Sequence, residues 1–286
     1  MQDLKRWVEA EFTDLDGFTP LGQGGQKTVL GCRSNRHGDV VLKLINIAQD
    51  PELVKREILA VRSACSRRTP RILEDGVKTT PLGQVVWLVE EMVPGHSLRD
   101  VINRGVLQPK QIIRLLLDTL ESLRAAEKAE IVHRDVKPEN IIQHYDDSSY
   151  WLIDFGIARH LTMESLTPTH HPFGKITPGY APPEQCYNVK REIDSRADLF
   201  ALGVTAFEAA TGTNPFRRGT RDPLEIMRRT ERIALPPLDL ASLSTNGLRD
   251  LIIAMTQKRR EHRPRTVADA YDWAVEICGD EGVKAT

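Results

Sequence analysis

The segment IVHRDVKPENII, residues 131–142, places three side chains that could handle phosphate in one polar loop between two apolar runs. Asp135 could accept a proton from a hydroxyl group, and Lys137 could neutralise a phosphoryl group during its transfer. Asn140 could ligate Mg²⁺, because this ion prefers oxygen ligands. Taken alone, the loop could also be a turn with a capping aspartate.

Two further segments fit the same chemistry. WLIDFG, residues 151–156, is an apolar run followed by Asp154, whose carboxylate suits a Mg²⁺ ion shared with substrate phosphates. LGQGGQKTV contains Gly22, Gly24 and Gly25, which let backbone N–H groups approach a polyphosphate. A Walker or dinucleotide loop would open into a helix, whereas strands are expected on both sides here. Each segment alone could be a plain turn, but the three in this order argue strongly against that interpretation.

Lys43 lies in the apolar run VVLKL, where an ammonium group needs a partner because an unpaired buried charge is costly. Glu57, on the helix expected after this strand, is the natural candidate. From the residues alone, a lysine on an edge strand with its ammonium group in water is an equal alternative.

Two kinds of element have to position these side chains. Before Pro94, runs rich in Val, Ile, Leu and Thr predict strands at residues 18–21, 28–32, 40–45 and 85–92. One helix is expected among them, with Asp50 as its N-cap and Pro51 at its first position. After Pro94, apolar residues recur at helical spacing in residues 109–126, 196–210, 223–230, 247–257 and 267–278. The sequence therefore predicts an α+β protein, β-rich first and mainly helical afterwards.

The composition excludes several classes of protein. The 286 residues include 39 Lys+Arg and 40 Asp+Glu, and the net charge of −1 disfavours a general binder of nucleic acid or anionic membranes. No uncharged apolar run approaches the roughly 18–20 residues that span a bilayer, and acidic residues stand where a secretory signal would be apolar. The four cysteines form no CxxC pair and are expected to be reduced. We therefore expect a cytoplasmic protein without a membrane segment.

In these motifs and their order, the sequence resembles the eukaryotic-like (Hanks-type) serine/threonine protein kinases, which bacteria also carry. The resemblance runs from about Phe18 to about Cys278. It implies a bilobal protein-kinase fold, with a small β-rich N-lobe carrying one main helix at residues 18–93 and a larger, mainly helical C-lobe at residues 94–286. Residues 1–17 are expected to form a helical extension.

The resemblance also implies roles in catalysis and nucleotide binding. ATP is the implied cofactor, with Mg²⁺ or Mn²⁺ held by Asn140 and Asp154. Asp135 is implied as the catalytic base, assisted by Lys137 and by a Lys43–Glu57 pair. The expected contacts of the nucleotide are the phosphate loop, the adenine-facing side chains and the hinge backbone: Gly22, Gly24, Gly25, Val29, Val41, Lys43, Glu91, Val93 and Ile142.

Other implied roles are structural. Glu184, in the motif PPE, matches the acid that pairs with a distant arginine, here Arg263. Asp198 matches a helix carboxylate that supports the catalytic loop from beneath. Thr177 matches the threonine that contacts Asp135 and the neighbouring lysine in serine/threonine enzymes.

Regulation by phosphorylation is expected in the segment between Asp154 and the PPE motif. Thr167 and Thr169 are the leading candidates, with Thr162 behind them, and Arg134 is the residue type that pairs with a phosphate on such a segment. The implied partners are proteins with Ser or Thr hydroxyls, including a second copy of the chain in trans. A common Ser/Thr/Pro loop without modification is the alternative.

Departures from the family pattern qualify these expectations. Lys27 replaces the third glycine of the phosphate loop, and an ammonium group in solvent is slightly favoured there over one that touches a phosphate. The position behind the adenine, where an apolar or Thr side chain is usual, is expected to hold Glu90. If the alignment shifts by one residue, Glu91 takes this position instead. A carboxylate there could divert Lys43 from the nucleotide. Other unusual residues are Val41, Ile176 and Pro182.

Two competing functions remain, and the first of them follows from these departures. The chain could be a pseudokinase-like scaffold or nucleotide-binding module, although the lysine, glutamate, aspartates and asparagine of the active form are all present. It could also be a small-molecule kinase of the aminoglycoside-phosphotransferase kind, although that relative lacks the PPE segment and its distant arginine. Transfer of phosphate to a protein favours the kinase, transfer to an aminoglycoside favours the small-molecule enzyme, and nucleotide binding without transfer favours the scaffold.

Overall fold

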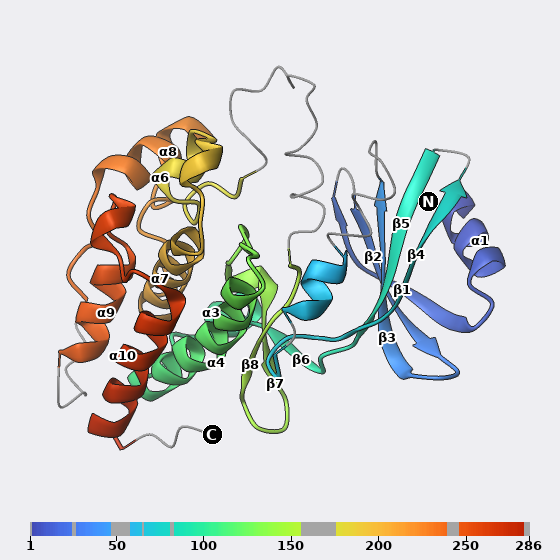
Figure 1. Ribbon diagram of the computed structural model, residues 1–286, viewed down its shortest axis with the longest axis horizontal. Coiled ribbons are helices and arrows are strands. Elements are labelled where there is room, and N and C mark those ends of the chain that lie inside the picture. The colour runs from blue at the N-terminus through green and yellow to red at the C-terminus, as the bar shows by residue number, and fades with distance from the viewer. Residues whose placement is uncertain are drawn as a thin grey trace.

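The computed structural model describes residues 2–24, 27–46, 58–64, 66–80, 83–155, 176–238 and 246–282. They form two lobes, a small one built on a β-sheet and a larger one built mainly of helices (Figure 1). The expected bilobal α+β fold is confirmed.

The small lobe contains a five-stranded antiparallel sheet in the order β1-β2-β3-β5-β4. Strand β3 lies in the middle of this sheet, with Val29 of β2 opposite Lys43 and Glu90 of β5 opposite Val41. All four predicted strands are present, and β1 starts three residues earlier than expected. The strands are β1 (Leu15–Gly24), β2 (Lys27–Ser34), β3 (Gly38–Asn46), β4 (Ile72–Thr80) and β5 (Gly83–Glu91).

The sequence pattern does not predict β4, whose residues ILEDGVKTT include two acids and a glycine typical of a turn. This strand lies at the edge of the sheet, where polar side chains keep contact with water and no strict alternation is required. Gly76 packs against the Trp87 ring of β5, since a Cβ there would lie 2.8 Å from the indole. The glycine therefore allows close contact between the two strands.

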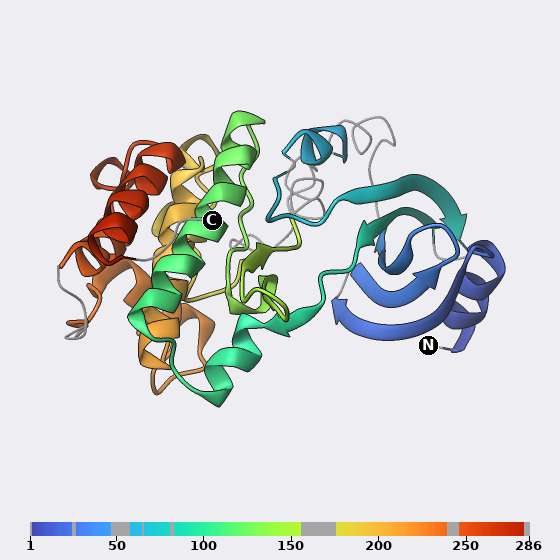
Figure 2. The ribbon, with the colours of Figure 1, turned by 90° about the horizontal axis from the view of Figure 1, so that it is seen from below.

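Helices lie on both sides of this sheet (Figure 1, Figure 2). Helix α1 (Gln2–Glu11) packs through Val8, which is fully buried, and Phe12 follows at its C-terminal end. The Phe12 ring meets Trp87 edge-on, at 5.4 Å between ring centroids. The N-terminal extension therefore packs on the small lobe of its own chain.

Residues 58–63 form a helical segment on the side of the sheet that faces the large lobe (Figure 1). Ile58 is buried there with Ile45, Val86 and Leu88. The N-cap and first turns expected for this helix, at residues 50–57, lie outside the described part of the chain.

The large lobe is organised around α7, whose residues 197–209 are all buried. A helix that is apolar on every side belongs inside a lobe, and α7 packs against both α4 and α9. The five predicted helices are present, and Gly247–Met255 ends two residues earlier than expected. The helices are α3 (Leu98–Arg104), α4 (Pro109–Lys128), α6 (Pro183–Cys186), α7 (Arg196–Thr211), α8 (Pro223–Arg232), α9 (Gly247–Met255) and α10 (Val267–Asp280).

A second, three-stranded sheet lies where the large lobe meets the small one (Figure 1). Its strands are β6 (Gly95–Ser97), β7 (Ile141–His144) and β8 (Tyr150–Leu152), in that order. Strands β7 and β8 are joined by a short turn, so the loop before β7 and the residues after β8 come close together. Among the described residues, no helix has the length and apolar character needed to cross a membrane.

Candidate active site

Three polar side chains gather around Asp135, namely Lys137 and Asn140 of the loop before β7 and Thr177 of a later segment. The Asp135 carboxylate accepts hydrogen bonds from the Thr177 hydroxyl at 2.7 Å and from the Lys137 ammonium group at 2.9 Å. The Asn140 amide donates to the Asp135 carbonyl at 2.8 Å and to its carboxylate at 3.1 Å. Lys137 also reaches the Thr177 hydroxyl at 3.3 Å. The expected contact between Thr177 and this loop is therefore present.

Asp198, at the start of α7, supports this loop from beneath. It is 2% exposed, and its carboxylate accepts the backbone N–H groups of His133 and Arg134, both at 2.7 Å. Burial raises the pKa of the Asp198 carboxyl to about 7, although the two N–H donors act in the opposite direction. Arg134 itself has φ +65°, an uncommon conformation for a residue with a side chain. The two bonds from Asp198 stabilise this strained backbone directly before Asp135.

Asp154 follows β8 and also has a positive φ, +68°. Its carboxylate forms ion pairs with the Lys43 ammonium group at 2.7 Å and with the Lys27 ammonium group. Burial alone would raise the pKa of Asp154, but the two lysine charges outweigh it and hold this pKa well below its usual range. Asp154 is therefore a carboxylate that attracts cations strongly.

Lys43 is 5% exposed on the middle strand of the sheet, so the edge-strand alternative is wrong. Besides Asp154, it forms an ion pair with Glu90 of the neighbouring strand β5. Burial would lower the pKa of Lys43, but the Asp154 and Glu90 carboxylates outweigh it and raise this pKa. The expected helix partner Glu57 lies outside the described residues. The sequence suggested that a carboxylate at position 90 could divert Lys43, and Lys43 does pair with Glu90.

Lys27 corrects one expectation. Its side chain is only 23% exposed and binds Asp154. The expectation that its ammonium group lies in solvent is therefore wrong. Burial, together with the nearby Lys43 charge, lowers the pKa of Lys27 in spite of the Asp154 carboxylate. Lys27 and Lys43 therefore both pair with the Asp154 carboxylate. Their positions in the sequence did not indicate this shared partner.

The expected adenine contacts come from both lobes. Val29 and Val41 lie on β2 and β3, Ile142 lies on β7, and all three are partly exposed. Glu90 is buried, whereas Glu91 is half-buried and pairs with Arg71, so of the two Glu90 fits the expected position behind the adenine better.

The expected hinge and phosphate loop lie at the ends of strands. Glu91 ends β5, and its N–H donates to the Arg71 carbonyl at 3.0 Å; Val93 follows outside the strand. Gly22 and Gly24 lie at the end of β1, and Gly25 lies outside the described residues.

Glu184 of α6 and Arg263 form the expected distant pair. Two guanidinium nitrogens donate to the two carboxylate oxygens, at 2.6 and 3.1 Å, and the arginine side chain is fully buried. Arg263 also donates to the carbonyls of Gln257 and Arg196 at 2.8 and 3.0 Å. This pair ties the segment after Thr177 to the interior of the large lobe.

Sequence reasoning missed a second polar network in the large lobe, which runs from the surface to the interior. Arg99 of α3 donates to Glu208 of α7 at 2.8 Å, to Glu139 of the catalytic loop at 2.9 Å and to the Tyr180 hydroxyl at 2.6 Å. Tyr180 in turn donates to Glu208. No motif marks Arg99, but a buried glutamate in the apolar helix α7 signals that a cationic partner has to lie close by.

The residues present fit a divalent cation. The Asn140 amide nitrogen is used by Asp135, which leaves the amide oxygen as a ligand. Asp154 already draws two ammonium groups. Among the described residues no group of three or more His, Cys, Asp or Glu side chains gathers for a metal, and a Mg²⁺ site built on one carboxylate, one amide and substrate phosphates needs none.

Of the residues expected to take part in regulation, only Arg134 lies in the described part of the chain. Arg134 lies at the catalytic loop, and the Gln185 amide donates to its carbonyl at 2.8 Å. Thr167, Thr169 and Thr162 lie outside the described residues.

A β-rich lobe carrying Lys43, joined to a helical lobe carrying Asp135, Asn140 and Asp154, defines a phosphotransferase fold of the protein-kinase type. The chain belongs to the family described as protein kinase domain, whose model matches residues 16–272.

Curated relatives share this family. Serine/threonine-protein kinase PknB of Mycolicibacterium smegmatis is 31% identical over 258 residues, which cover 87% of this chain and 40% of that protein. Probable serine/threonine-protein kinase PkwA of Thermomonospora curvata is 31% identical over 267 residues, covering 91% of this chain and 34% of that protein. Probable serine/threonine-protein kinase CPE1738 of Clostridium perfringens is 28% identical over 267 residues, which cover 91% of this chain and 36% of that protein. The chain thus spans well under half the length of these relatives, and the resemblance to bacterial serine/threonine kinases is confirmed.

Proposed function

We propose that this chain transfers the γ-phosphoryl group of ATP to Ser or Thr hydroxyls of proteins. The observation that carries the proposal is the group formed by Asp135, Lys137 and Thr177, whose side chains contact one another within 3.3 Å. The names of the relatives, each a serine/threonine-protein kinase, support the same acceptor class.

The acceptor hydroxyl would bind at Asp135, whose carboxylate is positioned to orient it and to take its proton. Lys137 lies 2.9 Å from that carboxylate and would neutralise charge on the phosphoryl group in transfer. Thr177 holds the other carboxylate oxygen and so fixes its direction. This part of the site works mainly by positioning and by charge neutralisation.

Lys43 would bind phosphates of the nucleotide, and Asn140 and Asp154 would hold Mg²⁺ or Mn²⁺. When bound, the metal neutralises charge that develops on the phosphate oxygens. The chain's own residues restrict access to this arrangement, because Lys43 is paired with Glu90 and Asp154 carries Lys27 as well. In the described conformation the two lysines pair with the carboxylate that would hold the metal, so a metal ion has to compete with them.

We also propose that the chain phosphorylates its own Thr167 or Thr169, in trans on a second copy. The support is the location of Arg134 beside Asp135, where a guanidinium group can pair with a phosphate. Mass spectrometry of the purified chain would find phosphate there in the active form and none in the Asp135→Asn variant. An active enzyme without phosphate on this segment would contradict the proposal.

The decisive test of the proposed function compares the wild type with Asp135→Asn, using labelled ATP with Mg²⁺, a generic basic protein and a panel of aminoglycosides. We expect label on protein, reduced about 10²–10⁴-fold by the substitution. Glu139→Gln, which removes an exposed carboxylate from the same loop, is the matched control and should lower transfer far less. Label on the aminoglycosides instead would overturn the proposed acceptor class.

The nucleotide-binding scaffold is the second candidate function. The ion pairs of Lys43 with Glu90 and of Lys27 with Asp154 favour it, because both engage groups that an active kinase needs for ATP and metal. Nucleotide binding without any transfer, in wild type and Asp135→Asn alike, would support the scaffold.

A cytoplasmic site of action is proposed from the free thiols of Cys32, Cys186 and Cys278, which suit a reducing compartment.

A further inference from the structure

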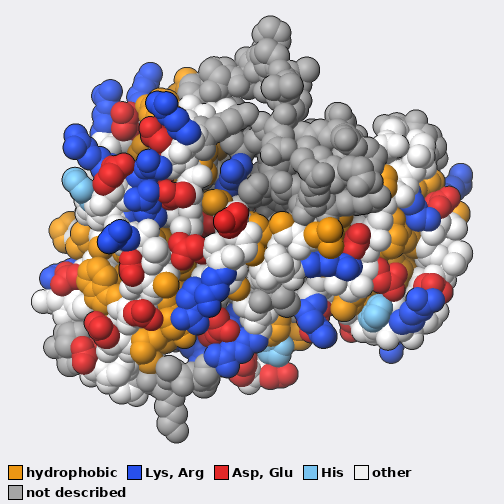
Figure 3. All heavy atoms as spheres, in the orientation of Figure 1, with side chains coloured by type: hydrophobic (Ala, Val, Ile, Leu, Met, Phe, Trp, Pro, Cys, Tyr) orange, Lys and Arg blue, Asp and Glu red, His pale blue; other side chains and the backbone are white. Residues whose placement is uncertain are grey.

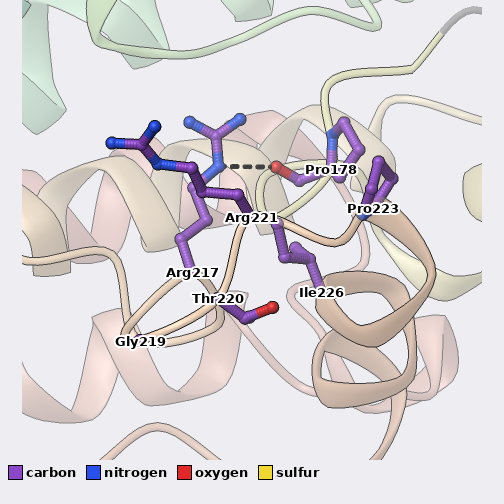
Figure 4. Close-up of a pocket in the computed structure, with 7 residues that line it drawn as sticks. All are labelled: Pro178, Arg217, Gly219, Thr220, Arg221, Pro223 and Ile226. Carbon is purple, nitrogen blue, oxygen red and sulfur yellow. Dashed lines mark hydrogen bonds between the residues drawn. The ribbon is translucent and has the colours of Figure 1, made fainter.

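A cavity of about 640 Å³, open to solvent, is lined by Pro178 and by residues between α7 and α8 (Figure 4). Pro178, which lines it, directly follows Thr177, and the Thr177 hydroxyl donates to Asp135. The rest of the wall comes from the loop between α7 and α8 and from α8 itself: Arg217, Gly219, Thr220, Arg221, Pro223 and Ile226. Whatever fills this cavity therefore lies close to the expected position of the acceptor hydroxyl.

Arg217 is held in this wall by fixed contacts. Its Nε donates to the Pro178 carbonyl at 2.8 Å, and its guanidinium group lies over the Tyr180 ring, 4.8 Å from the centroid. Asn214 accepts the Arg217 N–H at 3.2 Å and donates to the Gly179 carbonyl at 3.2 Å, which connects the two chain segments. Gly179 has φ +92°, and a Cβ there would come within 3.0 Å of Arg217. The positive φ, together with the close contact of Arg217, favours glycine at that position.

The cavity carries positive charge that no acidic side chain of the described residues neutralises through an ion pair. Arg217 and Arg221 form no ion pair with any residue of the described ranges, whereas Arg228 and Arg229 of α8 both pair with Glu225. Arg217 and Arg221 both line the cavity, and in the view of Figure 4 their guanidinium groups extend toward the same side of it. Figure 3 shows Lys and Arg side chains gathered over the end of the large lobe that contains α6 and α8. Two cations that line one cavity raise the local positive potential and attract an anion.

We propose that this cavity binds the carboxylate of an acidic residue of the protein substrate, close in sequence to the acceptor Ser or Thr. This inference rests on the proposed function and adds a substrate preference to it. Arg217 and Arg221 would pair with the carboxylate, since planar guanidinium groups match its geometry. Pro178, Pro223 and Ile226 supply an apolar wall for the methylene groups of that side chain.

The distance along the substrate follows from chain geometry. Pro178 is the next residue after Thr177, and an extended peptide advances about 3.4 Å per residue. An acidic side chain in the cavity would therefore belong to a residue about one to four positions from the acceptor.

The test uses a set of peptides with one Thr, an otherwise uncharged sequence, and a single Asp moved through the four positions on each side. The parent has Asn at all of these positions. We expect one position at which Asp raises kcat/KM about tenfold over the parent, which is the size of one charge-assisted hydrogen bond. The Arg217→Gln and Arg221→Gln variants should each reduce this preference, and the double variant should abolish it. The Arg218→Gln variant, from the same loop but outside the cavity wall, should keep it.

Fluorescence polarisation of the same peptides separates this inference from the proposed function. Tighter binding of the preferred Asp peptide, lost in the double variant, would support the cavity assignment even if the chain transferred no phosphate. Equal kcat/KM and equal binding for Asp and Asn at all positions would overturn it, with or without measurable transfer to a generic protein. An Asp preference that persists in the double variant would overturn it as well. Circular dichroism of each variant distinguishes loss of preference from loss of folding.

Discussion

The ammonium group of Lys43 forms an ion pair with the carboxylate of Glu90, inside the small lobe and between neighbouring strands. Glu90 is 7% exposed, so this carboxylate depends on Lys43 for its charge balance. Lys43 also binds Asp154 at 2.7 Å. A nucleotide phosphate that approaches Lys43 must therefore compete with two carboxylates.

The Glu90→Gln variant should bind ATP more tightly. The amide removes one of the two charges that hold Lys43, and Asp154 remains to balance the buried ammonium group. Because a hydrogen bond to a charged group contributes about 1.5–3 kcal/mol, we expect the Kd for ATP to fall about tenfold. Calorimetric titration measures this directly. Glu74→Gln, on the edge strand with a partly exposed partner His37, is the control and should leave the Kd unchanged. An unchanged or higher Kd in Glu90→Gln would contradict the prediction.

Lys27→Gln should lower the concentration of Mg²⁺ needed for nucleotide binding. Lys27 and a metal ion compete for the Asp154 carboxylate, and removal of the ammonium group leaves only Lys43 as a competitor. We expect the Mg²⁺ concentration at half-saturation to fall severalfold at fixed ATP. Titration of a fluorescent ATP analogue with Mg²⁺ measures it. A higher Mg²⁺ requirement would show instead that Lys27 assists binding through the phosphates.

Much of the fold was predictable because hydrophobic periodicity reports burial. Helix α4 has one apolar stripe, and the predicted start at Pro109 agrees with its position at N1. The edge strand β4 and the short elements β6 and α3 were not predicted, because they depend on contacts with neighbours distant in sequence. Pairing across the sheet, rather than local composition, makes β4 a strand.

The candidate site was predictable where a short motif contains both partners. Asp135, Lys137 and Asn140 lie within six residues, so their types already indicate their chemistry. The contact of Lys27 with Asp154 joins residues 127 positions apart, and no local pattern reports which of two lysines reaches a carboxylate. The cavity beside Thr177 could not be predicted for the same reason, since its two walls come from separate segments.

Stability should depend on pH through Asp198. Its pKa is about 7 in the folded chain, against the ordinary value of 3.8, so between these values the folded state binds one proton more than the unfolded state. The free energy of unfolding should therefore fall as pH rises from about 4 to about 7, by at most about 1.4 kcal/mol per pH unit from this group. Asp198→Asn removes this dependence, so its urea unfolding curves at pH 5 and pH 7.5 should lie closer together than those of the wild type. Equal pH dependence in both proteins would contradict the prediction.

Arg263→Ala should destabilise the large lobe strongly. The substitution leaves the Glu184 carboxylate, which is 8% exposed, without its two guanidinium donors, and it also removes donors from the carbonyls of Gln257 and Arg196. Breaking a buried ion pair on one side costs about 3–5 kcal/mol. Thermal unfolding monitored by circular dichroism should show a clearly lower Tm. Arg249→Ala, which breaks an exposed pair with Asp250, should change the free energy of unfolding by less than about 1 kcal/mol. Comparable losses in the two variants would show that the Glu184 pair adds no more than a surface contact.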